Sequence, residues 1–296
     1  MATKINSKNK KLILTDLDGT LFNNSSTVSD YTIKVVKEIV KKGHIFCIAT
    51  GRPWRSSEDV YKKLGINTII ANLNGSILTN PTDKNFLPIN LTFSKEVIKN
   101  ILSIKEIKKY LGTILVENYD GAYLISSEKN EDVNYEFLKK FHISKETNFL
   151  QINQNELDVI KKDLNSILIH LKDKNKIDLL SFKIKSITDT LVVRTWSLPH
   201  DDEGTVIEIN SIFSNKGTTL KFLSSYYAVP LHNCYAFGDG ENDLEMIRAI
   251  LNGYALKNSS HVIKLSSHRI TKYDNENHGV ARELANIFKI KINKSK

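Results

Sequence analysis

Cysteine is scarce in this chain, with two residues among 296, so a disulfide framework is not expected. Both residues, Cys47 and Cys234, fall in short apolar runs, and we expect them to be reduced thiols in a buried core. No apolar run approaches the roughly 18 residues that a membrane span requires. Residues 1–11 are polar and basic and lack the apolar segment of a secretory signal. The sequence therefore predicts a cytoplasmic protein with no membrane partner.

Dense blocks of one charge are also lacking, although the formal net charge is +9. The 42 lysine and arginine residues are spread over many predicted helices, without the interleaved aromatic residues of a nucleic-acid surface. We therefore expect solvated surface lysines and no nucleic-acid partner. A modest positive field would also attract phosphorylated substrates. The hydrophobic content of 41% is ordinary for a globular protein with one large or two modest domains.

The first chemically informative segment is residues 12–20. Its apolar residues 12–14 predict a buried strand, and Gly19 marks where the strand ends. Alternation along an extended chain would direct Asp16 and Asp18 to the same side. Two close like charges are costly unless a cation or a shared proton relieves them, and Mg²⁺ favours sparse carboxylate sites that also hold phosphate. A plain surface turn is the alternative, because Asp and Gly are common in turns.

A second acidic loop, residues 238–243, follows another short apolar run at 234–237. Ligands of open α/β sheets bind beyond the carboxyl ends of the strands. We therefore expect four carboxylates around one point: Asp16, Asp18, Asp239 and Asp243. The spacing Gly238-x-Gly240 does not continue to a third glycine, since Asp243 stands there, so a dinucleotide-binding loop is disfavoured.

The order of the motifs resembles the haloacid dehalogenase superfamily, and within it the Cof-type phosphatases, which carry a large C2-type cap. The motifs are Asp-Leu-Asp-Gly-Thr at 16–20, Ile-Ala-Thr-Gly-Arg-Pro at 48–53, Asn-Lys-Gly at 215–217 and Gly-Asp-Gly-Glu-Asn-Asp-Leu-Glu-Met at 238–246. A degenerate family segment, Ala-Leu-Lys-Asn, stands at 255–258. The resemblance covers nearly the whole chain and implies phosphoryl-transfer chemistry.

The predicted fold is α/β, a Rossmann-like parallel-sheet core with an inserted α+β cap domain. Strands and helices alternate over residues 12–71, which indicates a parallel sheet with right-handed crossovers. The pattern then changes to a mixture that suggests an antiparallel sheet: a helix at 94–110, a hairpin at 113–125, a further helix, a strand at 166–171, a helix from 174 and a strand at 191–195. We predict a core of residues 1–82 and 205–296, which resumes with a strand at 205–209. The resemblance identifies residues 83–204 as a C2-type cap.

Chemistry and resemblance together suggest the catalytic and metal-binding roles. Asp16 is the candidate nucleophile, since a carboxylate can attack phosphorus and form an aspartyl-phosphate. Asp18 is the candidate acid for the leaving alkoxide and then the base for water. The resemblance implies Mg²⁺ held by Asp16, Asp239 and the backbone carbonyl of Asp18. Asp243 is a direct ligand, a residue that orients water and Lys216, or a first-turn acid that only supports its helix.

The candidate phosphate-binding residues are Thr50, Gly51, Lys216 and Asn242. A hydroxyl and an amide at a strand-to-helix junction suit phosphoryl oxygens, and a lysine supplies charge near the transferring group. Thr50 could instead cap the next helix, and Lys216 could be solvated, although a cation opposes the dipole at a helix start. Arg52 contacts substrate or pairs with an acid. Residues 74–75, Asn-Gly, match a family position at the joint of core and cap, or form a plain turn.

The sequence thus predicts a Mg²⁺-dependent phosphatase of small phosphorylated metabolites such as sugar phosphates. A sugar phosphomutase and a non-catalytic basic binding protein are the alternatives. Substrate selection is expected from cap residues near strand ends and loops: Asn118, Tyr119, Asp120, Arg194 and Trp196. An oligomeric state is not indicated.

Overall fold

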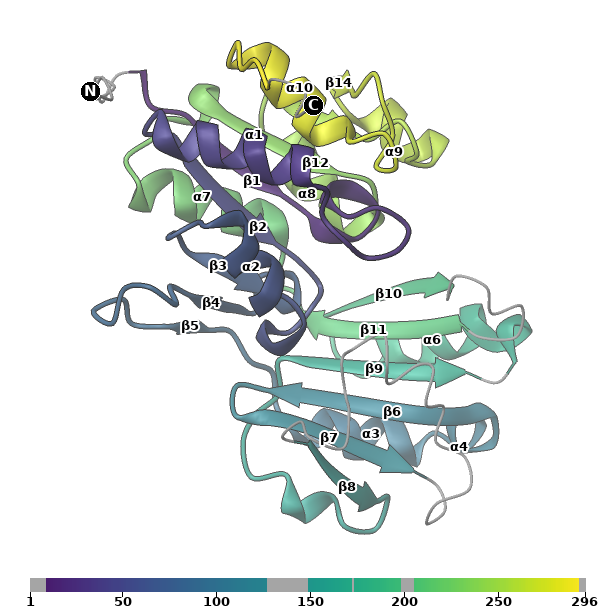
Figure 1. Cartoon of the computed structure of the whole chain (residues 1–296). Coiled ribbons are helices and arrows are strands. Elements are labelled where there is room, and N and C mark those ends of the chain that lie inside the picture. The colour runs from purple at the N-terminus through teal and green to yellow at the C-terminus, as the bar shows by residue number, and fades with distance from the viewer. Residues whose placement is uncertain (1–8, 127–148, 172, 198–204, 293–296) are drawn as a thin grey trace. The chain divides into compact units, whose positions relative to one another are not determined.

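The computed structural model describes residues 9–126, 149–171, 173–197 and 205–292 (Figure 1). The chain divides into two compact units. The first unit comprises Met1–Pro88 and Asn215–Lys296, and the second comprises Ile89–Ser214. The sequence suggests divisions at 82/83 and 204/205. The helix expected between the hairpin and residue 166 falls largely outside the described residues. Identification of the second unit as a cap stays a prediction.

The first unit is built on a mostly parallel sheet in the order β14-β13-β12-β1-β2-β3-β4 (Figure 1). The strands are β1 (Leu12–Thr15), β2 (Ile45–Ala49), β3 (Ile70–Asn72), β4 (Ile77–Thr79), β12 (Cys234–Gly238), β13 (Gly253–Ala255) and β14 (Arg269–Ile270). β1 pairs in parallel with both β12 and β2, and β4 runs antiparallel to its neighbour β3. The α/β class predicted from the sequence is confirmed.

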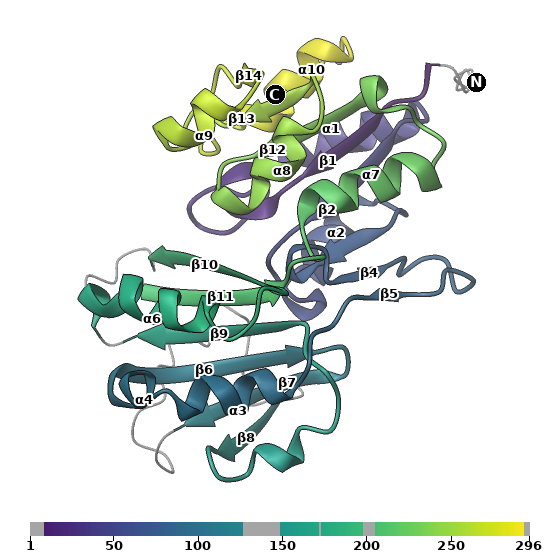
Figure 2. The ribbon, with the colours of Figure 1, turned by 180° about the vertical axis from the view of Figure 1, so that it is seen from behind.

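Helices cover both faces of this sheet. The first face carries α1 (Asp30–Lys41), α2 (Glu58–Leu64) and α10 (Gly279–Ile287), whose apolar residues share one buried cluster with β1, β2 and β12. The second face carries α7 (Lys216–Tyr226) and α8 (Leu244–Arg248), seen in front in Figure 2. A further short helix, α9 (His261–Ser266), precedes β14. Ser29 caps α1, since its side chain accepts a hydrogen bond from the Thr32 amide.

The second unit begins at β5 (Ile89–Asn90) and contains a six-stranded sheet in the order β10-β11-β9-β6-β7-β8. The strands are β6 (Leu111–Asn118), β7 (Gly121–Ser126), β8 (Phe149–Asn153), β9 (Ser166–Leu171), β10 (Leu191–Ser197) and β11 (Thr205–Ser211). All neighbours are antiparallel except β7 and β8. One face packs on α3 (Glu96–Ser103), α4 (Lys105–Tyr110) and α6 (Ile177–Lys185), the side seen in Figure 2.

Two expectations about elements need correction. β11 pairs with β9 and β10, so the strand expected to resume the core belongs to the sheet of the second unit. An apolar, β-branched run suits any sheet, and its local pattern does not specify its partners. The helix expected at 94–110 is two helices, because Ile104 adopts an extended conformation with φ −74° and ψ 110°. Among the described residues, no helix combines the length and the apolar character needed to cross a membrane.

Candidate active site

Two neighbouring strands of the first unit end in carboxylates. Asp16 directly follows β1, and Asp239 directly follows β12. The two strands run in parallel register, with Thr15 opposite Phe237, and the Asp16 amide donates a 3.0 Å hydrogen bond to the Phe237 carbonyl. The carboxyl ends of adjacent parallel strands therefore place both side chains at one edge of the sheet, where α/β proteins bind ligands.

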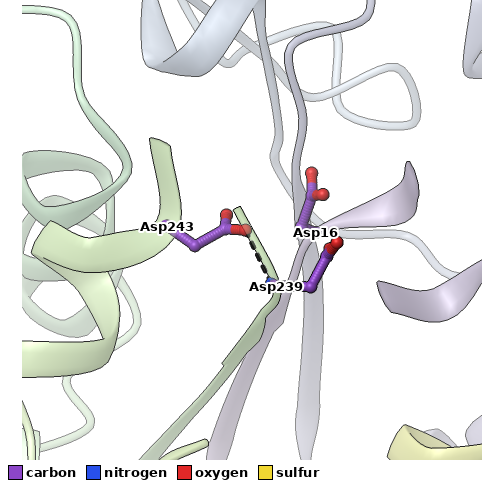
Figure 3. A group of neighbouring side chains, drawn as sticks. All are labelled: Asp16, Asp239 and Asp243. Atoms are coloured by element: carbon purple, nitrogen blue, oxygen red, sulfur yellow. Dashed lines mark hydrogen bonds between the residues drawn. The ribbon is translucent and has the colours of Figure 1, made fainter. Parts of the chain in front are cut away.

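A third carboxylate joins them from the start of α8. Asp16, Asp239 and Asp243 each offer an oxygen, and these atoms lie within 4.8 Å of one another (Figure 3). Asp243 Oδ2 accepts hydrogen bonds of 2.9 Å from the amides of Asp239 and Gly240, the first of which is drawn in Figure 3. A Cβ atom on Gly238 would lie 2.3 Å from the Asp243 side chain. Glycine at 238 therefore permits this close approach.

Lys216 is the cation of the group. It is the first residue of α7, its side chain is 0% exposed, and its Nζ donates 2.7 Å hydrogen bonds to Asp16 Oδ1 and to Asp243 Oδ1. A solvated lysine at a helix start is thereby excluded. Burial alone would lower the pKa of Lys216, but the charges of Asp16 and Asp243 outweigh burial and raise it.

The three carboxylates can carry more negative charge than the single Lys216 ammonium group neutralises. Burial raises the pKa of Asp16 well above its usual range, against the opposing effect of Lys216, and the charges of Asp243 and Asp239 raise it further. Burial and the Asp243 charge raise the pKa of Asp239 to about 7, although Thr20 Oγ1 donates a 2.6 Å hydrogen bond to it. A cluster of hard oxygen donors with excess negative charge fits a divalent cation such as Mg²⁺.

The Asp18 carboxylate is outside this cluster, contrary to the expectation of four carboxylates around one point. Arg52 binds it with two hydrogen bonds, from Nε to Oδ2 at 2.7 Å and from Nη2 to Oδ1 at 2.5 Å. The expectation from strand alternation was wrong here because the chain does not stay extended: Leu17–Leu21 forms a distorted helical turn in which Gly19 has φ 71°. A Cβ atom on Gly19 would lie 2.2 Å from Asp239 Oδ2.

The loop after β2 carries the next two candidates. Thr50 is fully buried, and its Oγ1 accepts a 3.1 Å hydrogen bond from the Arg52 amide, so it closes this loop and does not cap α2. Gly51 lies against the side chain of Asn74. Asn74 Oδ1 in turn accepts a 2.9 Å hydrogen bond from Asn242 Nδ2. The structure thus brings together residues from the second motif, the turn after β3 and the second acidic loop.

Sequence reasoning left several contacts of the site unassigned. Of the two alternatives for Arg52, pairing with an acid is confirmed, although the sequence did not indicate that the acid is Asp18. The hydrogen bond of Thr20 to Asp239 was not predicted. Asn258 Nδ2 donates a 2.8 Å hydrogen bond to the Gly19 carbonyl and so supports the first acidic loop. The motif at 255–258 contained the signal for Asn258, but no local pattern pointed to its partner.

The five residues proposed for substrate selection lie in the second unit. Asn118 Oδ1 accepts hydrogen bonds from the amides of Asp120 and Gly121, at 3.0 and 3.1 Å, and so closes the β6–β7 hairpin. Asp120 also forms a 2.5 Å ion pair with Lys162, and Tyr119 is 47% exposed. On β10, Arg194 stands opposite Glu208. Trp196 packs on an apolar cluster of the sheet that is separate from the cluster packed on α3, α4 and α6.

Comparisons with known proteins point to one family. Residues 13–284 match the family described as haloacid dehalogenase-like hydrolase. The chain is 31% identical over 287 residues to 5-amino-6-(5-phospho-D-ribitylamino)uracil phosphatase YitU of Bacillus subtilis, covering 94% of this chain and 98% of that protein. Two solved structures share the fold. A haloacid dehalogenase-like hydrolase from Bacteroides thetaiotaomicron has a TM-score of 0.75 and 22% identity, covering 94% of this chain and 100% of that one. A HAD/COF-like hydrolase from Plasmodium vivax has a TM-score of 0.76 and 20% identity, covering 96% and 97%.

Proposed function

This chain belongs to the haloacid dehalogenase-like hydrolases, and we propose that it is a Mg²⁺-dependent phosphatase of small phosphorylated metabolites that works through an aspartyl-phosphate. The superfamily predicted from the motifs is confirmed. The observation that carries the proposal is the buried group of Asp16, Lys216, Asp239 and Asp243 at the carboxyl ends of β1 and β12. A carboxylate held by a lysine beside two further carboxylates suits nucleophilic attack on a phosphoryl group.

We assign the metal to Asp16, Asp239 and the backbone carbonyl of Asp18. When bound, Mg²⁺ would neutralise the repulsion between an anionic nucleophile and an anionic phosphate. Asp243 is better suited to support than to direct ligation. Its Oδ2 already accepts from two backbone amides and its Oδ1 from Lys216, so it holds the Gly238–Gly240 loop and the lysine in place.

Asp16 and Asp18 divide the chemistry in two steps. In the first, a carboxylate oxygen of Asp16 forms a bond to phosphorus while the ester P–O bond breaks, and Asp18 gives a proton to the departing oxygen. In the second, Asp18 takes a proton from water as the water oxygen forms a bond to phosphorus and the bond between phosphorus and the Asp16 oxygen breaks, which releases inorganic phosphate and restores the Asp16 carboxylate. Lys216 fixes the orientation of Asp16 throughout, through its 2.7 Å hydrogen bond.

The phosphoryl oxygens are assigned to Thr50, Gly51, Lys216 and Asn242. An ammonium group has three donors, and Asp16 and Asp243 use two of those on Lys216. The third is therefore suited to a phosphoryl oxygen. The Gly51 amide, at the junction between β2 and the turn that leads to α2, provides a neutral donor of the kind that phosphate groups accept.

A relative and the second unit support a proposal about the substrate class. The Bacillus subtilis relative is named for a phosphorylated ribitylamino compound, so we infer that sugar and polyol phosphomonoesters are the class to test first. We propose that the five residues named above in the second unit contribute to the choice among them. Replacing the exposed Tyr119 by alanine would then change kcat/KM differently for different substrates and leave the hydrolysis of p-nitrophenyl phosphate within about twofold.

The test is phosphate release from a panel of sugar phosphates, nucleotides, flavin mononucleotide, pyridoxal phosphate and the ribitylamino phosphate, with Mg²⁺ present. Asp16→Asn should abolish release and retain the fold by circular dichroism. The matched control is Asp158→Asn, which should retain activity. Asp158 is an exposed carboxylate of the second unit that pairs with Lys99. Movement of phosphate within a sugar monophosphate without free phosphate would instead establish a mutase. Absence of turnover for every compound would favour a binding protein.

A further inference from the structure

The turn after β3 has an unusual backbone. Three consecutive residues, Leu73, Asn74 and Gly75, have positive φ angles of 49°, 57° and 92°. Glycine adopts this left-handed region freely and asparagine tolerates it, whereas leucine is disfavoured there. Such a run persists only where the surrounding structure determines it, and strained segments of this kind gather at functional sites. The contacts of the turn indicate what holds it in place.

The turn is tied to the loop after β2 by its backbone. The Leu73 amide donates a 3.2 Å hydrogen bond to the Arg52 carbonyl, and the Asn74 amide donates a 2.9 Å bond to the Thr50 carbonyl. The Asn74 side chain lies directly over Gly51, because a Cβ atom placed on Gly51 would be 3.5 Å from Asn74 Oδ1. The turn and the candidate phosphate loop therefore form one hydrogen-bonded unit.

The same turn packs against the helix start that carries Lys216. A Cβ atom on Gly75 would lie 2.4 Å from Thr219 Oγ1 and 3.2 Å from the Asn215 carbonyl oxygen. Glycine is thus required at 75 both for its φ angle and for this approach to α7. As a result, Asn74 is held between two elements that carry candidate phosphate ligands.

The Asn74 side chain reaches a third element, the second acidic loop. Asn74 is 0% exposed, and its Oδ1 accepts the 2.9 Å hydrogen bond from Asn242 Nδ2. An amide nitrogen has two donor hydrogens and an amide oxygen has none. The contact therefore fixes which end of the Asn242 amide faces Asn74. It leaves the second hydrogen of Nδ2 for another acceptor.

We propose that Asn74 is a positioning residue for phosphate recognition, which acts by orienting the Asn242 amide toward a phosphoryl oxygen. The proposal rests on the proposed function, because it takes Asn242 as a phosphate-binding residue. The strained turn then has a function, because its left-handed backbone places the buried Asn74 amide beside Gly51 and Asn242. The substrate class it concerns is any phosphomonoester that binds with its phosphate beside Gly51.

The experiment is a double-mutant cycle on Asn74 and Asn242 in the full chain. Asn74→Gly removes the amide and keeps a residue that adopts positive φ without strain. Asn242→Ala removes its partner, and the double variant closes the cycle. Ala228→Gly is the control, since Ala228 also has a positive φ of 50° but lies in the exposed connection after α7. The measurements are kcat and KM for p-nitrophenyl phosphate, the inhibition constant of inorganic phosphate, and the melting temperature.

We expect Asn74→Gly and Asn242→Ala each to raise the inhibition constant of phosphate about tenfold. In the Asn242→Ala background, Asn74→Gly should change that constant less than twofold, because its effect passes through Asn242. Ala228→Gly should remain within twofold of the wild type. The proposal would be overturned if the double variant raised the inhibition constant by the product of the two single effects. An unchanged inhibition constant in Asn74→Gly would also overturn it. If the wild type hydrolyses no phosphomonoester, the proposed function fails, and the same cycle measured as phosphate binding by calorimetry still decides the role of Asn74.

Discussion

Arg52 holds the Asp18 carboxylate in a two-point ion pair, with Nε 2.7 Å from Oδ2 and Nη2 2.5 Å from Oδ1. The guanidinium also lies 4.9 Å from the centre of the Phe22 ring, within the range of a cation–π contact. The paired carboxylate lies outside the cluster of Asp16, Asp239 and Asp243. Both oxygens of the Asp18 carboxylate are thus engaged by Arg52. In the proposed mechanism this contact has to open before Asp18 can reach the departing oxygen of a substrate.

The role of Asp18 can be separated from its structural contact by Asp18→Asn, which keeps an oxygen for Arg52. We expect kcat for alkyl phosphates to fall by about 10²–10⁴-fold, the usual contribution of a general acid or base. Formation of the aspartyl-phosphate from p-nitrophenyl phosphate should fall much less, since nitrophenolate leaves without a proton. Rapid-quench measurement of the first turnover tests this. Equal losses for alkyl and nitrophenyl esters in that first step would contradict the assignment.

Removal of Lys216 should destabilise the first unit strongly when no metal is present. Lys216→Met leaves Asp16 and Asp243 buried without their cation, and breaking a buried pair in this way costs about 3–5 kcal/mol. Urea unfolding in the presence of a chelator measures the loss. The control is Lys62→Met, which removes an exposed ion pair with Glu58 and should cost no more than about 1 kcal/mol. Addition of Asp16→Asn to Lys216→Met should restore part of the stability, and a further loss would be the contrary result.

Activity should require Mg²⁺, and Ca²⁺ should inhibit. Mg²⁺ imposes a near-octahedral geometry, whereas the larger Ca²⁺ accepts more ligands and could bind Asp16 through both oxygens, which would prevent its attack. Chelator-treated protein should be inactive, and Mg²⁺ should restore turnover. Mg²⁺ should also raise the melting temperature of the wild type more than that of Asp239→Asn, because a ligand of the folded state stabilises it by mass action. Full activity after chelation, or equal activity with Ca²⁺, would refute the requirement.

Protonation of His44 should contribute to the pH dependence of the unfolding free energy. Burial, and then the charges of Lys42 and Lys11, lower the pKa of His44 from 6.5 to about 4, and its Nδ1 accepts a 3.2 Å hydrogen bond from the Lys11 amide. The unfolded chain therefore takes up a proton on this residue at higher pH than the folded chain. The stabilisation is complete above pH 6.5 and declines as pH falls from 6.5 to about 4.

His44→Asn keeps an acceptor for the Lys11 amide but does not titrate. Between pH 6.5 and about pH 4, the unfolding free energy of His44→Asn should fall by about 1 kcal/mol less than that of the wild type. This figure is reduced for solvent screening, because His44 is half-buried. Unfolding free energies measured at intervals between about pH 7.5 and pH 4.5 would give the difference. His268→Asn, at an exposed position, should retain the wild-type dependence. An identical decline in wild type and His44→Asn would show that other groups cause it.

The placement of Asp16 and Asp239 could be predicted because it depends on local rules. Each follows a short apolar strand, and parallel strands present their carboxyl ends at one edge. Lys216 was also predictable, since a cation opposes the dipole at a helix start and therefore implies an anionic partner. The structure shows that these partners are Asp16 and Asp243.

The ion pair of Asp18 and the amide pair of Asn74 with Asn242 were not predictable by the same rules. Asp18 departs from the expected direction because Leu17, which separates it from Asp16, already belongs to the helical turn Leu17–Leu21, and strand alternation does not apply to a turn. Asn74 and Asn242 lie far apart in the sequence, and their contact requires a left-handed backbone at two non-glycine residues, Leu73 and Asn74. The membership of β11 in the second sheet likewise depends on strand pairing.

The sequence by itself determined which residue types stand at the strand ends and helix starts of this protein, and hence the carboxylate and lysine chemistry of the site. These features follow from hydrophobic periodicity, capping and turn propensities, which act over a few neighbouring residues. Only the tertiary structure decided which of those residues meet: Asp243 with Lys216, Asp18 with Arg52, and Asn74 with Asn242. Such contacts depend on backbone angles at single turn residues and on the packing of elements distant in the chain, and no local pattern contains that information.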